Sequence, residues 1–184
     1  EWGESKNVKW KVALPGRGTA TPIIWGERIF ILTAIGPEGD PGAASPGADS
    51  NAGASAAAGG GQPRGGGIGA SGKPTGKFQF VVLCLDRKTG KTLWRRTAKE
   101  EIPHEGHHPD HGFASGSPVT DGQFLYAYFG SRGLHCYDLE GNLKWSKEFG
   151  QMKTRNGFGE GASPALHGDT LVVNWDDETE NDFI

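Results

Sequence analysis

Apolar and polar residues alternate in short runs along most of the chain, and no stretch shows the 3.6-residue period of an amphipathic helix. The runs are rich in β-branched and aromatic residues and are separated by glycine and proline, as in Ile29–Leu32 and Phe124–Phe129. This pattern is typical of β-strands joined by tight turns. We therefore predict an all-β protein with almost no helix.

One sequence element occurs three times along the chain. It consists of a small residue and a proline, a glycine four residues after the proline, and then an apolar run, as in Thr21–Gly26, Ser117–Gly122 and Ser163–Gly168. The last two prolines are 46 residues apart, and the first two are 96 apart, or about 54 without the insertion described below. A period of about 40–50 residues is that of one four-stranded propeller blade.

A second element alternates with the first and reads as strand, tight turn, strand. Its two copies are Cys84–Trp94 and Cys136–Trp145. In each copy the aspartate can accept hydrogen bonds from turn amides, and the glycine can supply a positive φ. The cysteines hold the same place in both copies, so we expect small buried strand residues in neighbouring blades, in preference to a reactive or bridged pair.

Residues 36–77 form a low-complexity insertion rich in Gly, Ala, Ser and Pro. Such a segment cannot bury enough apolar surface to offset its chain entropy, so we expect it to be disordered. It interrupts a predicted hairpin between Ile29–Ala34 and Phe78–Leu85. We interpret it as a tolerated surface insertion, with a tether or recognition loop as the alternative, inside one partial propeller domain that spans residues 1–184.

The hairpin around Thr89-Gly90-Lys91, with Asp86 before it and Trp94 after it, resembles the tryptophan-docking motif of propellers of the pyrroloquinoline-quinone (PQQ) type. The copy at Cys136–Trp145 is one residue shorter and has Glu-Gly-Asn in place of Thr-Gly-Lys. The resemblance implies a partial β-propeller of four-stranded antiparallel blades. About two blades would be complete, roughly 19–97 and 114–149, with part of a third, and we expect the natural protein to be longer.

The same resemblance leaves several functions open, because one fold hosts many activities. It implies a quinone-free, non-catalytic module that binds a protein or small ligand at the propeller face, in the periplasm, in the cell envelope or outside the cell. The alternative is a fragment of a quinoprotein alcohol or sugar dehydrogenase that uses PQQ and Ca²⁺. The adjacent-cysteine pair that such dehydrogenases often carry is not in this sequence.

The charge and composition of the chain disfavour several classes of partner and of site. The formal net charge of −3 gives no electrostatic reason to expect nucleic acid as a partner. No run of 18 apolar residues occurs, so we predict no transmembrane helix. The two cysteines form no CxxC pair, which disfavours a ribbon-like zinc site.

The segment 103–111 is the first candidate for chemistry, because four histidines and two acids lie within it. His104 and His108 match the HExxH pattern of zinc proteases, but that pattern works only on a helix, and prolines flank it here. A looser Zn²⁺ or Cu²⁺ site is the hypothesis that remains, and it would serve a metal-binding hydrolase as a third function. Its ligands would be His104, His107, His108 and His111, and the competing interpretation is a hydrogen-bonded polar loop.

The glycine-rich stretches before the inner strands are the second candidate. They place Phe113 and Phe158 at the predicted mouth of the central channel, with Arg155, Asn156 and Glu160 beside them. These three polar residues could bind an anionic or sugar-like ligand or, in the dehydrogenase alternative, the cofactor. Glycine would also be required there simply because inner strands crowd at the axis. The acidic run 176–178 is interpreted as a solvated turn in preference to a Ca²⁺ site.

Overall fold

The chain folds into consecutive antiparallel sheets that follow one another along the sequence. The computed structural model describes residues 3, 6–37, 72–108, 110–178 and 182–183, so positions 38–71 of the predicted insertion lie outside the described residues. The described residues contain no α-helix, as expected, and only two short 3-10 turns, η1 (Gly130–Arg132) and η2 (Arg155–Gly157). The all-β prediction is therefore confirmed.

Two four-stranded sheets make up most of the structure, and both have the strand order of their sequence. The first contains β1 (Ile23–Trp25), β2 (Arg28–Ile35), β3 (Phe78–Asp86) and β4 (Thr92–Glu101). The second contains β5 (Val119–Thr120), β6 (Phe124–Tyr128), β7 (Leu134–Asp138) and β8 (Leu143–Lys147). These are two propeller blades, and the insertion leaves the first blade between β2 and β3, where the sequence predicted it.

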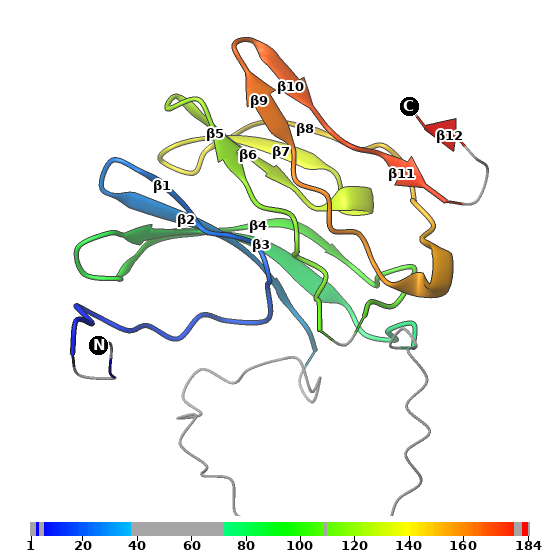
Figure 1. The fold of residues 1–184 in the computed structure, drawn as a ribbon, viewed down its shortest axis with the longest axis horizontal. Helices are drawn as coiled ribbons and strands as arrows, with labels where there is room; N and C mark the ends of the chain where they lie inside the picture. The colour runs from blue at the N-terminus through cyan, green and yellow to red at the C-terminus, as the bar shows by residue number, and fades with distance from the viewer. Residues whose placement is uncertain (1–2, 4–5, 38–71, 109, 179–181, 184) are drawn as a thin grey trace, which may run out of the picture.

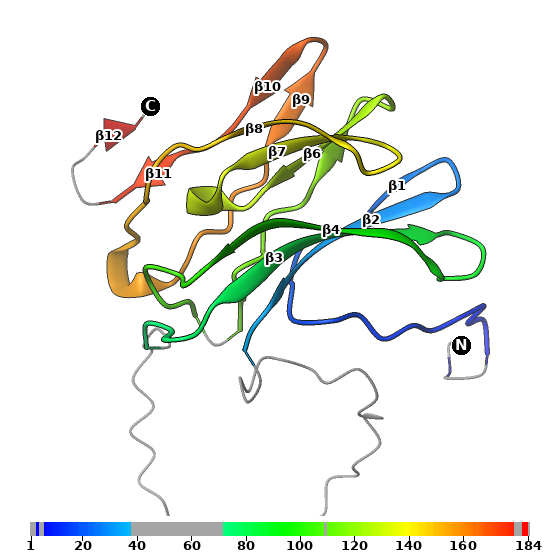
Figure 2. The same ribbon diagram turned by 180° about the vertical axis from the view of Figure 1, so that it is seen from behind.

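Two further strand pairs follow the second blade: β9 (Ala165–His167) with β10 (Thr170–Val172), and β11 (Asp176–Asp177) with β12 (Asp182–Phe183). Figures 1 and 2 show the first sheet, the second sheet and the β9–β10 hairpin one after another, as in successive blades. The inner strands β5 and β9 are in contact. The β9–β10 hairpin therefore occupies the position of the start of a third blade.

The main hydrophobic core lies between the two blades. Phe80 and Val82 of the first blade pack with Leu125 and Phe129 of the second, and Phe113 joins them from the connection between the blades. The opposite face of the first blade is also apolar and is partly covered by the N-terminal segment. Burial on both faces explains why β2 and β3 consist of nearly continuous apolar residues instead of strict alternation.

The repeat found in the sequence is visible in the register of the strands. Cys84 pairs with Trp94, and Cys136 pairs with Trp145. A bulge follows each cysteine directly, at the same position in both blades. The prediction that the two cysteines are equivalent buried strand residues is confirmed, and both thiols are free.

The turn chemistry is also as predicted. Asp86 accepts hydrogen bonds from the backbone of Lys88 and Thr89, and Asp138 accepts them from turn amides in the second blade. Gly90 and Gly141 follow at φ values of +73° and +84°, which other residues rarely adopt. The Thr89 hydroxyl, together with these amides, holds the pKa of Asp86 below its usual value, and the Lys144 ammonium, together with Asn142, does the same for Asp138.

Trp10 and Trp94 each contact a turn of the blade that follows them in the sequence. The indole of Trp94 donates a 3.0 Å hydrogen bond to the Leu139 carbonyl of the second blade and lies against Gly141, where a Cβ would come within 2.7 Å of the ring. Trp10 lies on Gly90 of the first blade in the same way. A flat side chain at a fixed offset from the turn thus joins consecutive repeats.

The inner ends of the blades are joined by hydroxyl groups of the small-residue–proline element. Ser117 accepts a 2.9 Å hydrogen bond from the backbone amide of Thr21, and Ser163 accepts one of the same length from the amide of Ser117. The two residues of the first bond are 96 positions apart and those of the second are 46 apart. These are the same separations as between the repeated prolines in the sequence. The small side chain before each proline therefore links one blade to the next.

Burial should make both cysteines unreactive in the folded protein. Desolvation raises the pKa of Cys84 and of Cys136 from 9.0 to about 11. At pH 8 this lowers the thiolate fraction about a hundredfold, so labelling by a thiol reagent should slow by at least that factor relative to the unfolded chain. Labelling of the native protein at the unfolded rate would contradict the buried positions.

The same pKa shifts predict how stability depends on pH. Each folded-state pKa is raised, so the folded state retains protons that the unfolded state loses between about pH 9 and pH 11. The free energy of unfolding should therefore fall as the pH rises through this range. Urea titrations of the wild type at pH 8 and pH 10 measure the loss, which should shrink when Cys84 is replaced by alanine. An equal loss in the C84A variant would contradict the assignment.

Candidate functional site

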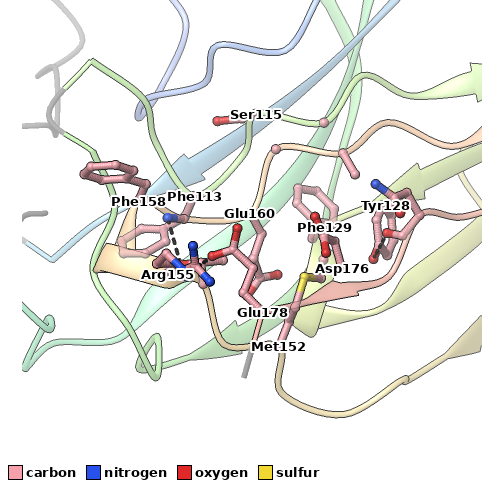
Figure 3. A pocket seen from close by; sticks show the side chains of 17 residues that line it. Phe113, Ser115, Tyr128, Phe129, Met152, Arg155, Phe158, Glu160, Asp176 and Glu178 are labelled. Carbon is pink, nitrogen blue, oxygen red and sulfur yellow. Dashed lines mark hydrogen bonds between the residues drawn. The ribbon is translucent and has the colours of Figure 1, made fainter. Parts of the chain in front are cut away.

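A cavity of about 250 Å³ opens where the second blade meets the chain that leads to the third. Its walls come from the start of the second blade at Ser115 and Gly116, from the end of β6 at Tyr128 and Phe129, and from the segment between Met152 and Ala162. Figure 3 shows Arg155, Glu160 and Glu178 together, with Met152 beside them. This is the region that the glycine-rich sequence pattern predicted as the channel mouth.

Glu160 forms the floor of this cavity and is held by the second blade. Its side chain is 8% exposed. It accepts hydrogen bonds from the backbone amide and the hydroxyl of Ser131, and one of 3.0 Å from Arg132. Gly130 is required beside it, because a Cβ there would lie 1.8 Å from the carboxylate. Glu160 is thus engaged with the protein, so its role in the cavity is to position the wall.

Arg132 balances the charge of this buried carboxylate. Its side chain is 4% exposed, and its guanidinium also lies 3.2 Å from Glu101 at the end of β4. The guanidinium carbon sits 5.3 Å from the ring centre of Phe80 and 5.5 Å from that of Phe113. Arg132 therefore joins the first blade, the second blade and the segment before the third through one cation.

Arg155 lies at the rim of the cavity, in η2. Its backbone amide donates a hydrogen bond to Glu178, whereas its guanidinium makes no ion pair or hydrogen bond with any described residue. Asn156 follows at a φ of +63° and is not among the residues that line the cavity. Of the three residues predicted at the mouth, the structure brings Arg155 and Glu160 to one cavity and leaves Asn156 outside it.

Two acidic residues of the cavity were missed by the sequence analysis. Asp176 and Glu178, interpreted there as part of a solvated turn, both line the cavity, and both are exposed. The signal was present: residues two apart in an extended segment point to the same side, and Asp176 lies in β11. What the sequence could not give is that this segment folds back over Arg155.

Phe113 and Phe158, the two predicted aromatic residues, also line the cavity. The ring of His107 stands on Phe113 at a centroid distance of 4.6 Å, and that of His108 stands on Phe158 at 5.4 Å. In the same loop, Glu105 accepts hydrogen bonds from the backbone amide and hydroxyl of Thr154. The loop after β4 therefore supports the back of the cavity.

The four histidines of that loop point to different neighbours. His104 Nε2 donates a 2.6 Å hydrogen bond to the Met152 carbonyl and lies 3.9 Å from Glu160, while His108 and His111 contact each other. The segment is not helical, which removes the geometry that the HExxH pattern needs. Among residues 72–108 and 110–178, no three His, Cys, Asp or Glu side chains lie close enough together to hold a metal ion. A metal site in this loop stays a prediction.

The comparison with protein families adds a second line of support for the fold. The PQQ-repeat profile described as "outer membrane protein assembly factor BamB" matches residues 79–180, more than half of the chain. The chain belongs to this family of PQQ-like repeats. A search of curated proteins found no match.

The PQQ-repeat match runs from the third strand of the first blade to the segment after β11. It therefore includes the whole second blade and every residue that lines the cavity between positions 113 and 178. The chain is a PQQ-like β-propeller module. In the described part of the chain, no helix has the length and apolar character required to cross a membrane.

Proposed function

We propose that this PQQ-like propeller module is a quinone-free binding protein, and that its ligand occupies the cavity between the second blade and the start of the third. The observation that carries the proposal is a cavity with a hydrogen-bonded floor at Glu160 and free charges at its rim. Glu160 is fixed by Ser131 and Arg132, whereas Arg155 and Asp176 have no ion-pair partner among the described residues. Groups left unpaired at the mouth of a concave site are available to a ligand.

The charge of the cavity disfavours PQQ as that ligand. Four charged side chains line it, and three of them are carboxylates. Arg132 neutralises Glu160 from behind, which leaves Asp176 and Glu178 against the single cation Arg155. A quinone that carries several carboxylates would face more negative than positive charge there unless a cation were bound with it. Glu160 is already engaged by Ser131 and Arg132, so it is not free to act as a ligand of such a cation. The dehydrogenase alternative therefore gains no support from the described residues.

A place in the bacterial cell envelope fits this proposal. The matched profile takes its name from an outer membrane protein assembly factor, and this chain shares its repeat. We accordingly propose that the module lies in the periplasm, elsewhere in the cell envelope or outside the cell, as one partial propeller domain over residues 1–184 that carries the insertion at 36–77. Its partner is a small molecule or a short protein segment at the propeller face.

A substitution that fills the cavity tests the proposal. Gly161 lines the cavity, and a Cβ there would meet only Ser115, at 4.0 Å, so Gly161→Leu should fold while its side chain occupies the ligand space. We expect a library of small polar fragments, screened by ligand-observed NMR, to contain fragments that bind the wild type. These fragments should bind G161L with an affinity at least about tenfold weaker. Binding should persist in the control Gly72→Leu, which lies in open space.

The outcome that contradicts the proposal is equally specific. If no fragment binds the wild type more tightly than G161L, the cavity is not a ligand site. Circular dichroism and a thermal melt of both leucine variants confirm that each still folds before the affinities are compared.

A further inference from the structure

We infer that the cavity selects a small zwitterionic ligand of the amino-acid or dipeptide class. In this arrangement Arg155 binds the ligand's carboxylate, and Asp176 and Glu178 bind its ammonium group. The inference rests on the proposed function, since it names the chemical class of ligand for the same cavity. It follows from the signs of the free charges, from their failure to pair with one another, and from the size and lining of the cavity.

Charges of both signs stand unpaired at the rim. The Arg155 guanidinium makes no ion pair within 4.0 Å with any described carboxylate, although Asp176 and Glu178 line the same cavity. The contact between Arg155 and Glu178 runs through the backbone amide and leaves the guanidinium free. Figure 3 shows the side chains of Arg155 and Glu178 on the same side of Glu160. The rim therefore offers one site for an anion and another for a cation.

A ligand with charge of one sign satisfies only part of this rim. An anion that reaches Arg155 lies near Asp176 and Glu178, and a cation that reaches these acids lies near Arg155, so like-charge repulsion opposes each. A neutral ligand partly removes all three charges from water without giving them a countercharge. A zwitterion gives each side its opposite charge, and a guanidinium suits a carboxylate because it donates two parallel hydrogen bonds.

The volume and the walls limit the size of the ligand. About 250 Å³ falls below the range of roughly 300–1,000 Å³ for drug-sized ligands. The inner walls are apolar and aromatic at Met152, Tyr128 and Phe129, below the charged rim. An amino acid or dipeptide can place its charged backbone ends at the rim and an aliphatic or aromatic side chain against these walls.

Three probes test whether the ligand is a zwitterion, and two of them each lack one of the two charges. They are glycyl-leucine, its N-acetyl derivative and glycyl-leucinamide, each titrated into the wild-type chain by isothermal calorimetry. The free dipeptide should bind most tightly. Loss of either charge should weaken binding about three- to fivefold, as expected for partly exposed ion pairs.

Two variants that each remove one charge show which residue binds which end of the ligand. Asp176→Asn should weaken binding of glycyl-leucine and glycyl-leucinamide, which carry the ammonium group, and should not weaken binding of the N-acetyl form, which loses a like-charge repulsion. Arg155→Gln should weaken binding of glycyl-leucine and the N-acetyl form, which carry the carboxylate, and should not weaken binding of the amide, which loses a like-charge repulsion. A merely structural role for either residue would weaken all three probes alike.

The outcomes separate the ligand class from the proposed function. Crossed losses in D176N and R155Q support the zwitterionic class. Tighter binding of the N-acetyl form, of the amide or of a neutral fragment than of glycyl-leucine overturns the class, while loss of that binding in G161L keeps the cavity as the site. Absence of binding by every probe and fragment overturns both.

Discussion

Replacing Arg132 with methionine should lower the free energy of unfolding by about 3–5 kcal/mol, the largest effect that we expect from any polar residue of this chain. The guanidinium is almost fully buried between Glu101 and Glu160. Methionine keeps an apolar stem against Phe80 and Phe113 but leaves two carboxylates without their cation. An uncompensated charge in a low-dielectric site costs several kcal/mol. Urea denaturation followed by tryptophan fluorescence measures the loss.

A matched arginine supplies the control for this measurement. Arg28 pairs with Glu140 at 3.0 Å, but both side chains are solvent-accessible, at 32% and 64%. Arg28→Met should therefore cost no more than about 1 kcal/mol. Adding Glu160→Gln to Arg132→Met should recover part of the loss, because it removes one of the two uncompensated charges. Equal losses for Arg132→Met and Arg28→Met would contradict the inter-blade role of Arg132.

Replacing Trp94 with alanine should cost about 3 kcal/mol, because this side chain joins the two blades. Its indole lies on Gly141 and donates a hydrogen bond to Leu139, and its ring is within 6.4 Å of Tyr137. Truncation removes all three contacts and opens a cavity in the interface. Thermal unfolding by calorimetry measures the loss as a lower melting temperature.

Trp145 occupies the equivalent position in the second blade and provides the comparison. It pairs with Cys136 as Trp94 pairs with Cys84, but it is 44% exposed. Trp145→Ala should cost less than about 1 kcal/mol in this chain, since nearly half of its surface already faces water. If both tryptophans cost the same, their contribution comes from the strand pair and not from the contact with the next blade.

Much of the fold could be predicted because its determinants are local and repeated. The turn aspartates, the glycines with positive φ and the small-residue–proline starts each specify a short backbone segment. Their spacing then gave the blade period, and the hydrogen bonds from Thr21 to Ser117 and from Ser117 to Ser163 join the residues that the repeat aligned. The equivalence of the two cysteines followed from the same alignment, whereas the bulge after each of them is visible only in the strand register.

The site was predictable only in part, because its partners are far apart in sequence. The glycine-rich pattern identified Arg155 and Glu160, and both line the cavity. Nothing local indicates that Glu160 is neutralised by Arg132, 28 residues earlier, or that this arginine also reaches Glu101. Burial decides which charge serves structure and which faces a ligand, and burial depends on the tertiary arrangement of the blades.

The central claim that this propeller module is quinone-free is tested most directly by one calorimetric titration. PQQ with Ca²⁺ is titrated into the wild-type chain and into Gly161→Leu under the same conditions. Because Glu160 is engaged by Ser131 and Arg132 and, among the described residues that line the cavity, only Arg155 is free to bind the carboxylates of the quinone, we predict no saturable binding to either protein at micromolar concentrations. Stoichiometric micromolar binding to the wild type that G161L abolishes would contradict the account and make this cavity the cofactor site of a quinoprotein.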